Sequence, residues 1–196
     1  SFVPVSGITG VPTAAFIGYP LTIAGTVEPG NATNRTIFWS IKDDGYTESE
    51  LEGNTLTAWG DGTVILTATI TNGTAPGEDY AQDFEVTVTR FYQVDNITGV
   101  PTTVTFGTPL PLTGTVEPDY ATNQTIVWSV KDPGTTVATI TGNTLSTRAV
   151  GTVIVTATIA NGSKVINDVD GSYSLADYTQ DFEIEVRELV LNPAPP

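Results

Sequence analysis

The chain has 196 residues, of which 39% are hydrophobic, enough to form a core in one large domain or two small ones. Its 22 acidic residues outnumber 7 basic ones and give a net charge of −15, so it lacks the basic patch needed to bind nucleic acid or anionic lipids. The chain contains no Cys, His or Met, which excludes disulfides, thiol nucleophiles, Cys/His zinc sites and a Ser–His–Asp triad.

No apolar stretch approaches the roughly 20 residues that span a bilayer, so we expect no direct insertion into a membrane. The first residue is Ser1 rather than methionine, and no signal peptide precedes it. We therefore expect the chain to be a processed product or a piece of a longer protein, and its start says nothing against export.

The first 90 residues consist of short extended segments separated by turns. Val, Ile and Thr are abundant and favour strands, and no window shows a sustained helical period. Turn signals interrupt the apolar runs, among them Glu28-Pro29-Gly30, Asp44-Gly45 and Asn72-Gly73. We expect strands near residues 5–9, 13–16, 20–27, 35–41, 47–51, 54–58, 63–71 and 81–89.

Alternating hydrophobicity indicates antiparallel sheets with one buried face. In residues 63–70, Val64, Leu66, Ala68 and Ile70 share one face, while mostly threonines occupy the other. In the heptad TIFWSIK (36–42), Trp39 shares a face with the two isoleucines. We expect its ring to lie between two sheets, in the position that a disulfide occupies in other sandwiches.

The chain repeats itself at an offset of 89 residues. From Ile8 to Gly73 the alignment needs no gap, and 39 of 66 positions are identical. Trp39 aligns with Trp128, which carries the same expected core role. DYAQDFEVTV (79–88) matches DYTQDFEIEV (177–186) at an offset of 98, so the second copy has nine extra residues within 163–176.

The repeat predicts an all-β fold of two tandem immunoglobulin-like β-sandwich domains joined end to end, because about seven short strands in 90 residues is typical of that sandwich. We expect domain 1 at residues 1–90, domain 2 at 91–191 and a proline-rich tail at 192–196. The joining segment 90–96 contains no flexible Gly/Ser-rich or Pro-rich linker, so limited bending is expected.

Both copies resemble the bacterial Ig-like repeats, often called group 2, of large surface proteins and adhesins. The resemblance covers residues 5–90 and 94–189 and rests on GVPT, the Trp-Ser strand, GNTL and the GTV.(V/L)TATI strand followed by Asn-Gly. Copy one departs from the pattern at residues 47–62. The resemblance implies an extracellular location, tandem arrays and spacer or adhesive roles, with no catalytic residues to carry over.

Catalysis is not expected, because the acidic residues fall mostly in turns and at outward strand positions, and a domain of this size seldom forms a deep cleft. Calcium is the one cofactor that the sequence raises. The insertion places Asp168 and Asp170 in an Asp-x-Asp-Gly sequence, with Asp177 seven residues further on. This matches part of an EF-hand loop, although Ile166 occupies the first ligand position and the bidentate Glu is missing. The alternative is that Asp170-Gly171 forms a polar hairpin tip.

Three aromatic residues are candidates for a sugar site. Tyr19, Tyr46 and Trp59 occur only in copy one, and copy two has Thr108, Thr135 and Arg148 in their places. Aromatic rings near loop tips can stack on sugars, but single exposed aromatics are also common.

The sequence therefore favours a non-catalytic, extracellular Ig-like repeat that serves as a semi-rigid stalk or spacer of a bacterial cell-surface protein. The alternative is an adhesin or carbohydrate-binding module. The expected partners are neighbouring repeats of the same protein, with glycans or host proteins as partners of the alternative function.

Overall fold

The computed structural model describes residues 1–169 and 171–189, and within this part of the chain every regular element is a strand. Backbone contacts divide the chain into two compact units. Unit 1 contains Ser1–Phe91 together with Ile166–Ser174, and unit 2 contains Tyr92–Val165 and the chain from Leu175 onward. The predicted proline-rich tail at 192–196 lies outside the described residues.

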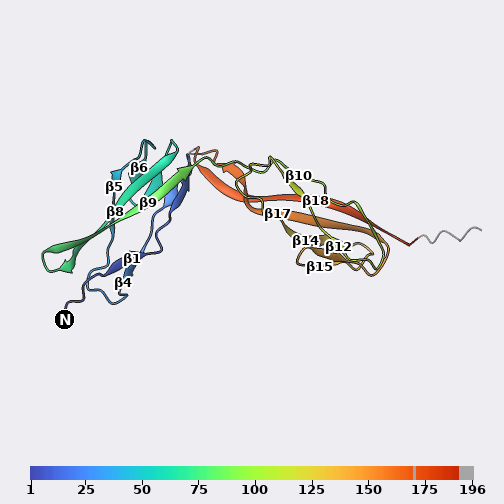
Figure 1. The fold of residues 1–196 in the computed structure, drawn as a ribbon, viewed down its shortest axis with the longest axis horizontal. Helices are drawn as coiled ribbons and strands as arrows, with labels where there is room; N and C mark the ends of the chain where they lie inside the picture. The colour runs from blue at the N-terminus through green and yellow to red at the C-terminus, as the bar shows by residue number, and fades with distance from the viewer. Residues whose placement is uncertain (170, 190–196) are drawn as a thin grey trace, which may run out of the picture. The chain divides into compact units, whose positions relative to one another are not determined.

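Unit 1 is a sandwich of a four-stranded and a three-stranded sheet, with a small ladder at one end (Figure 1). Its strands are β1 (Gly7–Thr9), β2 (Ala14–Phe16), β3 (Leu21–Thr22), β4 (Thr26–Glu28), β5 (Phe38–Asp43), β6 (Glu50–Glu52), β7 (Thr55–Thr57), β8 (Gly62–Ala75) and β9 (Glu78–Thr89). The sheets have the orders β2-β9-β8-β5 and β3-β7-β6, and β1 pairs with β4. Only β2 runs parallel to its neighbour, β9.

Unit 2 repeats this topology strand for strand. Its strands are β10 (Asn96–Thr98), β11 (Thr103–Thr105), β12 (Leu110–Pro111), β13 (Thr115–Glu117), β14 (Val127–Asp132), β15 (Thr139–Thr141), β16 (Thr144–Ser146), β17 (Gly151–Ile166) and β18 (Tyr173–Arg187). The sheets have the orders β11-β18-β17-β14 and β12-β16-β15, with β10 paired to β13. The predicted all-β fold of two Ig-like sandwiches is therefore confirmed.

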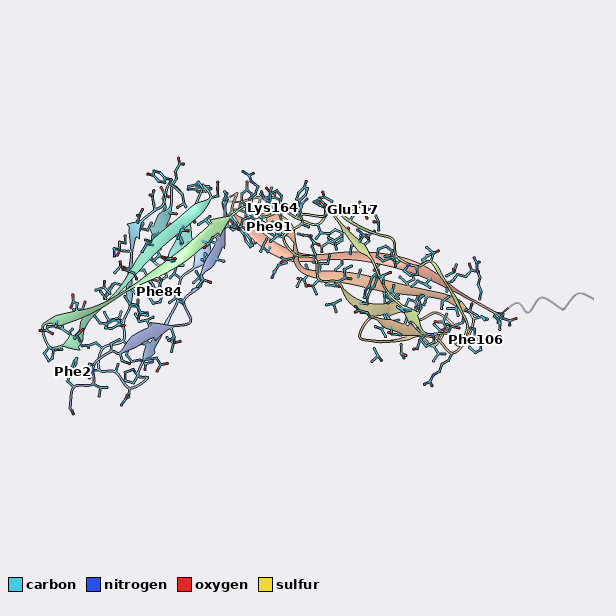
Figure 2. All side chains as sticks on the ribbon, in the orientation of Figure 1. Phe2, Phe84, Phe91, Phe106, Glu117 and Lys164 are labelled. Carbon is cyan, nitrogen blue, oxygen red and sulfur yellow. The ribbon has the colours of Figure 1, made fainter. Side chains whose placement is uncertain are left out.

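The core of each unit is built by the alternating strands. All four apolar residues of β8 at positions 64, 66, 68 and 70 are fully buried, as are their counterparts on β17. Trp128 is 6% exposed and its ring centroid lies 5.9 Å from that of Phe182. Trp39 is half-buried and packs in a similar way against Phe84, with 5.8 Å between the ring centroids; Phe84 is labelled in Figure 2.

A glutamine side chain ties the short first strand of each unit to the large sheet. The amide of Gln82 accepts a hydrogen bond from the Ile8 N–H at 2.9 Å and donates one to the Ile8 carbonyl at 3.4 Å. Gln180 makes the same pair of contacts with Ile97. The side chain thus satisfies backbone groups that would otherwise need a neighbouring strand.

Two expected features differ from the structure. The strand expected at 20–27 is two strands, β3 and β4, because Gly25 passes against Ile8: a Cβ at Gly25 would lie 2.6 Å from Ile8 Cγ2. Asn72-Gly73 is not a turn but a bulge inside β8. Asn72 has a positive φ of 53° and donates its N–H to the Asp79 carboxylate at 2.8 Å, which lets the strand continue to a tip at Pro76-Gly77.

The nine extra residues of copy two lengthen the hairpin of β17 and β18 beyond the corresponding bulge. Asn161 has a φ of 51° and donates its N–H to Asp177 at 3.0 Å, as Asn72 does to Asp79. Ile166–Ser174 is the end of this hairpin and belongs by its contacts to unit 1, whereas sequence reasoning placed it in the second domain.

Candidate functional site

Tyr46 and Trp59 lie on neighbouring loops of unit 1, one after β5 and one after β7. Thr47 joins these loops: it is fully buried, and its carbonyl accepts hydrogen bonds from the N–H groups of Trp59 and Gly60, both at 2.9 Å. The Thr47 hydroxyl donates to the carbonyl of Asp44 at 2.5 Å. These contacts fix the backbone from which both aromatic side chains project.

The same backbone frame recurs in unit 2 with different side chains on it. Thr136 is fully buried, and its carbonyl accepts from the N–H groups of Arg148 at 2.8 Å and Ala149 at 3.1 Å. Tyr46 is 95% exposed and Trp59 is 55% exposed, so both rings are accessible to a ligand in unit 1. The two copies thus share a scaffold and differ in the side chains that it presents.

Tyr19 has a different environment from the other two candidate sugar-binding residues. It is only 8% exposed, and its ring packs against Phe16 (6.1 Å between centroids), Phe91 (5.7 Å) and Tyr173 (5.4 Å). Its hydroxyl has no hydrogen-bond partner among the described residues. Burial, and to a smaller extent the Tyr173 phenol, raise the pKa of Tyr19. No open ring face is left for a sugar, so Trp59 and Tyr46 are the exposed members of the trio.

Sequence reasoning missed Phe16 and Tyr173 as members of this aromatic group. The offset of 89 contains a signal for Phe16, because Thr105 stands opposite it, as Thr108 stands opposite Tyr19. Tyr173 has no counterpart at all in copy one, because it falls in the insertion. Positions at which the two otherwise similar repeats differ therefore carry the sequence signal for this aromatic group.

The three aspartates predicted to bind calcium are only partly described. Asp170 lies outside the described residues. Asp168 is at the hairpin end, where Asn167 accepts a hydrogen bond from the Val169 N–H at 3.0 Å. Asp177 holds the bulge at Asn161, a role that Asp79 also has in copy one without any insertion. Within residues 1–169 and 171–189, no cluster of three or more acidic side chains has the spacing of a metal site. Calcium binding stays a prediction.

A charged pair crosses the exposed face of the large sheet in each unit. Lys42 on β5 contacts Asp83 on β9, which also accepts a hydrogen bond from Thr67 on β8 at 2.7 Å. Lys131, Asp181 and Thr156 repeat the arrangement in unit 2. The hydrogen bond from the lysine, and next that from the threonine, lower the pKa of each aspartate below its usual range.

A shallow pocket also recurs beside the edge strand of each unit. In unit 1 it has a volume of about 430 Å³ and lies between residues 33–38 and the bulge at 70–72. In unit 2 it has a volume of about 370 Å³ and lies between residues 122–127 and 159–161. The side-chain amide of Asn34 donates to the Asn72 carbonyl at 2.9 Å, and Asn123 does the same to Asn161. Because the pocket is formed by repeated scaffold residues, it reflects the shared fold.

Comparison with known proteins gives one informative relative by sequence. No family model matches the chain. A protein described as an Ig-like virion protein, from Serratia phage KSP90, is 32% identical over 170 residues, which is 83% of this chain. The chain is similar in sequence to this Ig-like protein, and its fold is that of two Ig-like domains in tandem. The Ig-like pair spans 63% of the length of that relative.

A solved structure supports the fold of the Ig-like pair. The fibronectin(III)-like modules of Clostridium thermocellum CbhA match with a TM-score of 0.50 and 14% identity, over 93% of this chain and 94% of theirs. At this identity the similarity concerns the sandwich architecture alone. The resemblance to Ig-like repeats is thus confirmed by the sequence relative, and the sandwich fold by the solved structure.

Proposed function

We propose that the Ig-like pair is a non-catalytic structural module, displayed on the outside of a phage particle or of a bacterial surface protein, where it serves as a semi-rigid spacer. The observation that carries the proposal is the 32% identity, over most of the chain, to a protein named for its place in a virion. The chain spans 63% of that relative, so the spacer would be one part of a longer protein.

The surface chemistry supports this role. A net charge of −15 on 196 residues keeps neighbouring copies apart in a crowded array. The edge strand β5 has Lys42 on its exposed face, and a bulge lies between Ile41 and Asp43. Charged side chains and bulges discourage the pairing of one sheet edge with another, which a repeated surface module has to avoid.

Immunogold labelling tests the proposed location. Antibodies raised against the whole Ig-like pair would be applied to intact phage particles and intact bacterial cells from the source of the sequence. We expect gold on the outside of one of them, abolished when the antibody is first saturated with the purified pair. Recovery of the protein only from the soluble contents of lysed cells would contradict the proposal.

Sugar binding is a second candidate function, and the exposure of Trp59 and Tyr46 on a hydrogen-bonded frame favours it. If these rings stack on a saccharide, binding to a glycan array should fall about tenfold or more in Trp59→Ala. Trp59→Arg, which installs the residue of copy two, should lose binding equally. A spacer without ligand would give no signal above background in the wild-type protein.

A further inference from the structure

The hairpin end Ile166–Ser174 belongs to unit 1, although both strands that carry it begin or end in unit 2. Along the chain, membership of the units therefore changes after Phe91, after Val165 and after Ser174. A simple tandem repeat would show only the first of these changes. The two additional changes both fall within residues 163–176, where copy two has nine extra residues.

Tyr173 is the residue of this segment that contacts Tyr19 and Gly18 of unit 1. Its ring centroid lies 5.4 Å from that of Tyr19, with the rings inclined at 45°. A Cβ added at Gly18 would lie 3.0 Å from the Tyr173 Cδ2 and Cε2 atoms, so the ring packs directly over the Gly18 backbone. Gly18 has a φ of +77° and leaves room there that a side chain would fill.

Beneath Tyr173 lies an aromatic cluster, which we define as Phe16, Tyr19 and Phe91. The centroids of Phe16 and Phe91 are 5.3 Å apart, and both rings meet Tyr19 edge to face. Phe91, labelled in Figure 2, follows the end of β9. Edge-to-face packing at these separations is the geometry that aromatic rings favour, and it fixes the position of the Tyr19 ring.

The aromatic cluster occurs only in copy one, and Tyr173 occurs only in copy two. Copy two has Thr105 and Thr108 in place of Phe16 and Tyr19, so it lacks the cluster. Copy one turns at Pro76-Gly77 and has no equivalent of Tyr173. The contact with Tyr173 thus explains why copy one has aromatic side chains at positions 16 and 19 where copy two has threonines.

We propose that the aromatic cluster is the docking surface for the segment Ile166–Ser174, with Tyr173 as the anchor, and that this contact within unit 1 protects the backbone around Gly18 against local opening. The cluster and Tyr173 then form a matched set of side chains within unit 1.

Hydrogen exchange on the whole chain tests the proposal. The most direct probes are the N–H groups of Ile17, bonded to the Thr89 carbonyl at 3.0 Å, and Gly18, bonded to the Ala58 carbonyl at 2.8 Å. In Tyr173→Ser we expect both to exchange roughly tenfold faster, because one aromatic contact is lost. Val169→Ser is the matched control, since Val169 is in the same segment and 94% exposed, and it should leave both rates unchanged.

A double-substitution cycle separates docking from a general weakening of the core. Tyr19→Thr installs the residue of copy two, and the pair Tyr19→Thr with Tyr173→Ser should exchange no faster than Tyr19→Thr alone. Tyr19→Thr could unfold unit 1, so a second variant is needed in which residues 164–176 are replaced by the short tip of copy one around Pro76-Gly77. In this variant the Ile17 and Gly18 N–H groups should exchange at the same rates as in Tyr173→Ser. The proposal would be overturned if the Ile17 and Gly18 exchange rates in Tyr173→Ser stayed within twofold of wild type. It would also be overturned if the rate increase in the double variant equalled the product of the increases in the two single variants.

Discussion

At the scale of single residues, the two equivalent tryptophans are the largest side chains committed to the sandwich cores. Trp128 is buried among the apolar residues of unit 2 and meets Phe182. We expect Trp128→Ala to lower the free energy of unfolding of unit 2 by about 3–5 kcal/mol, because it removes a large ring and leaves a cavity. Urea denaturation measures this, and Tyr46→Ala, at an exposed position, should change stability by less than about 0.5 kcal/mol.

The charged pairs on the large sheets predict a dependence of stability on acid. Asp83 and Asp181 have lowered pKa values in the folded protein, chiefly through hydrogen bonds from Lys42 and Lys131. As the pH falls, these aspartates therefore become protonated in the unfolded chain before they do in the folded protein. The stabilisation is fully present above the ordinary aspartate pKa of about 3.9, and it is lost as the pH falls through the lowered pKa values of the folded protein.

Melting temperatures between pH 6 and pH 2 test this expectation. The double variant Asp83→Asn with Asp181→Asn should show a flatter decline in the acid range than the wild-type protein. Asp61→Asn with Asp119→Asn is a matched control, because these aspartates occur in none of the ion pairs found among the described residues. Equal slopes for the wild-type protein and the first double variant would show that the pairs contribute nothing.

At the scale of elements, the bulge in β8 fixes where the long hairpin bends. A Cβ on Gly73 would lie 2.7 Å from Tyr80 Cβ and 2.9 Å from the Ile70 carbonyl, so the backbone would have to move. We expect Gly73→Ala to cost about 1–3 kcal/mol of stability, and Gly162→Ala to do the same in unit 2. Chemical denaturation measures both effects. Gly30→Ala, whose Cβ would meet no atom within 4 Å, should be nearly neutral; an equal loss there would contradict the steric argument.

The elements also show which structural features could be predicted from the sequence. The alternation at 63–70 predicted the burial of β8 because a strand with one wet face must place every second residue inside. Asn72-Gly73 was wrongly predicted as a turn, because the residues that favour positive φ are the same in a tight turn and in a bulge. What decides between them is the Asp79 carboxylate, which is brought near only once β9 has paired with β8.

At the scale of the whole molecule, the internal repeat was sufficient to predict two similar sandwiches, whereas the environment of Tyr19 was not predictable. Its neighbours Phe91 and Tyr173 are distant in the chain, and no local pattern indicates that they meet. Sequence alone therefore could not separate Trp59 and Tyr46 from Tyr19 as candidates for a sugar site, because the burial of Tyr19 depends on these distant contacts.

The central claim is that the chain folds as two like-built sandwiches, each with its own core. Hydrogen exchange in Trp128→Ala tests it most directly, by comparing the interior amides of β8 with those of β17. We predict a rise of roughly a hundredfold or more in β17, from the expected loss of stability, and a change of less than tenfold in β8. A rise by the same factor in both strands would mean one shared core and would contradict the account.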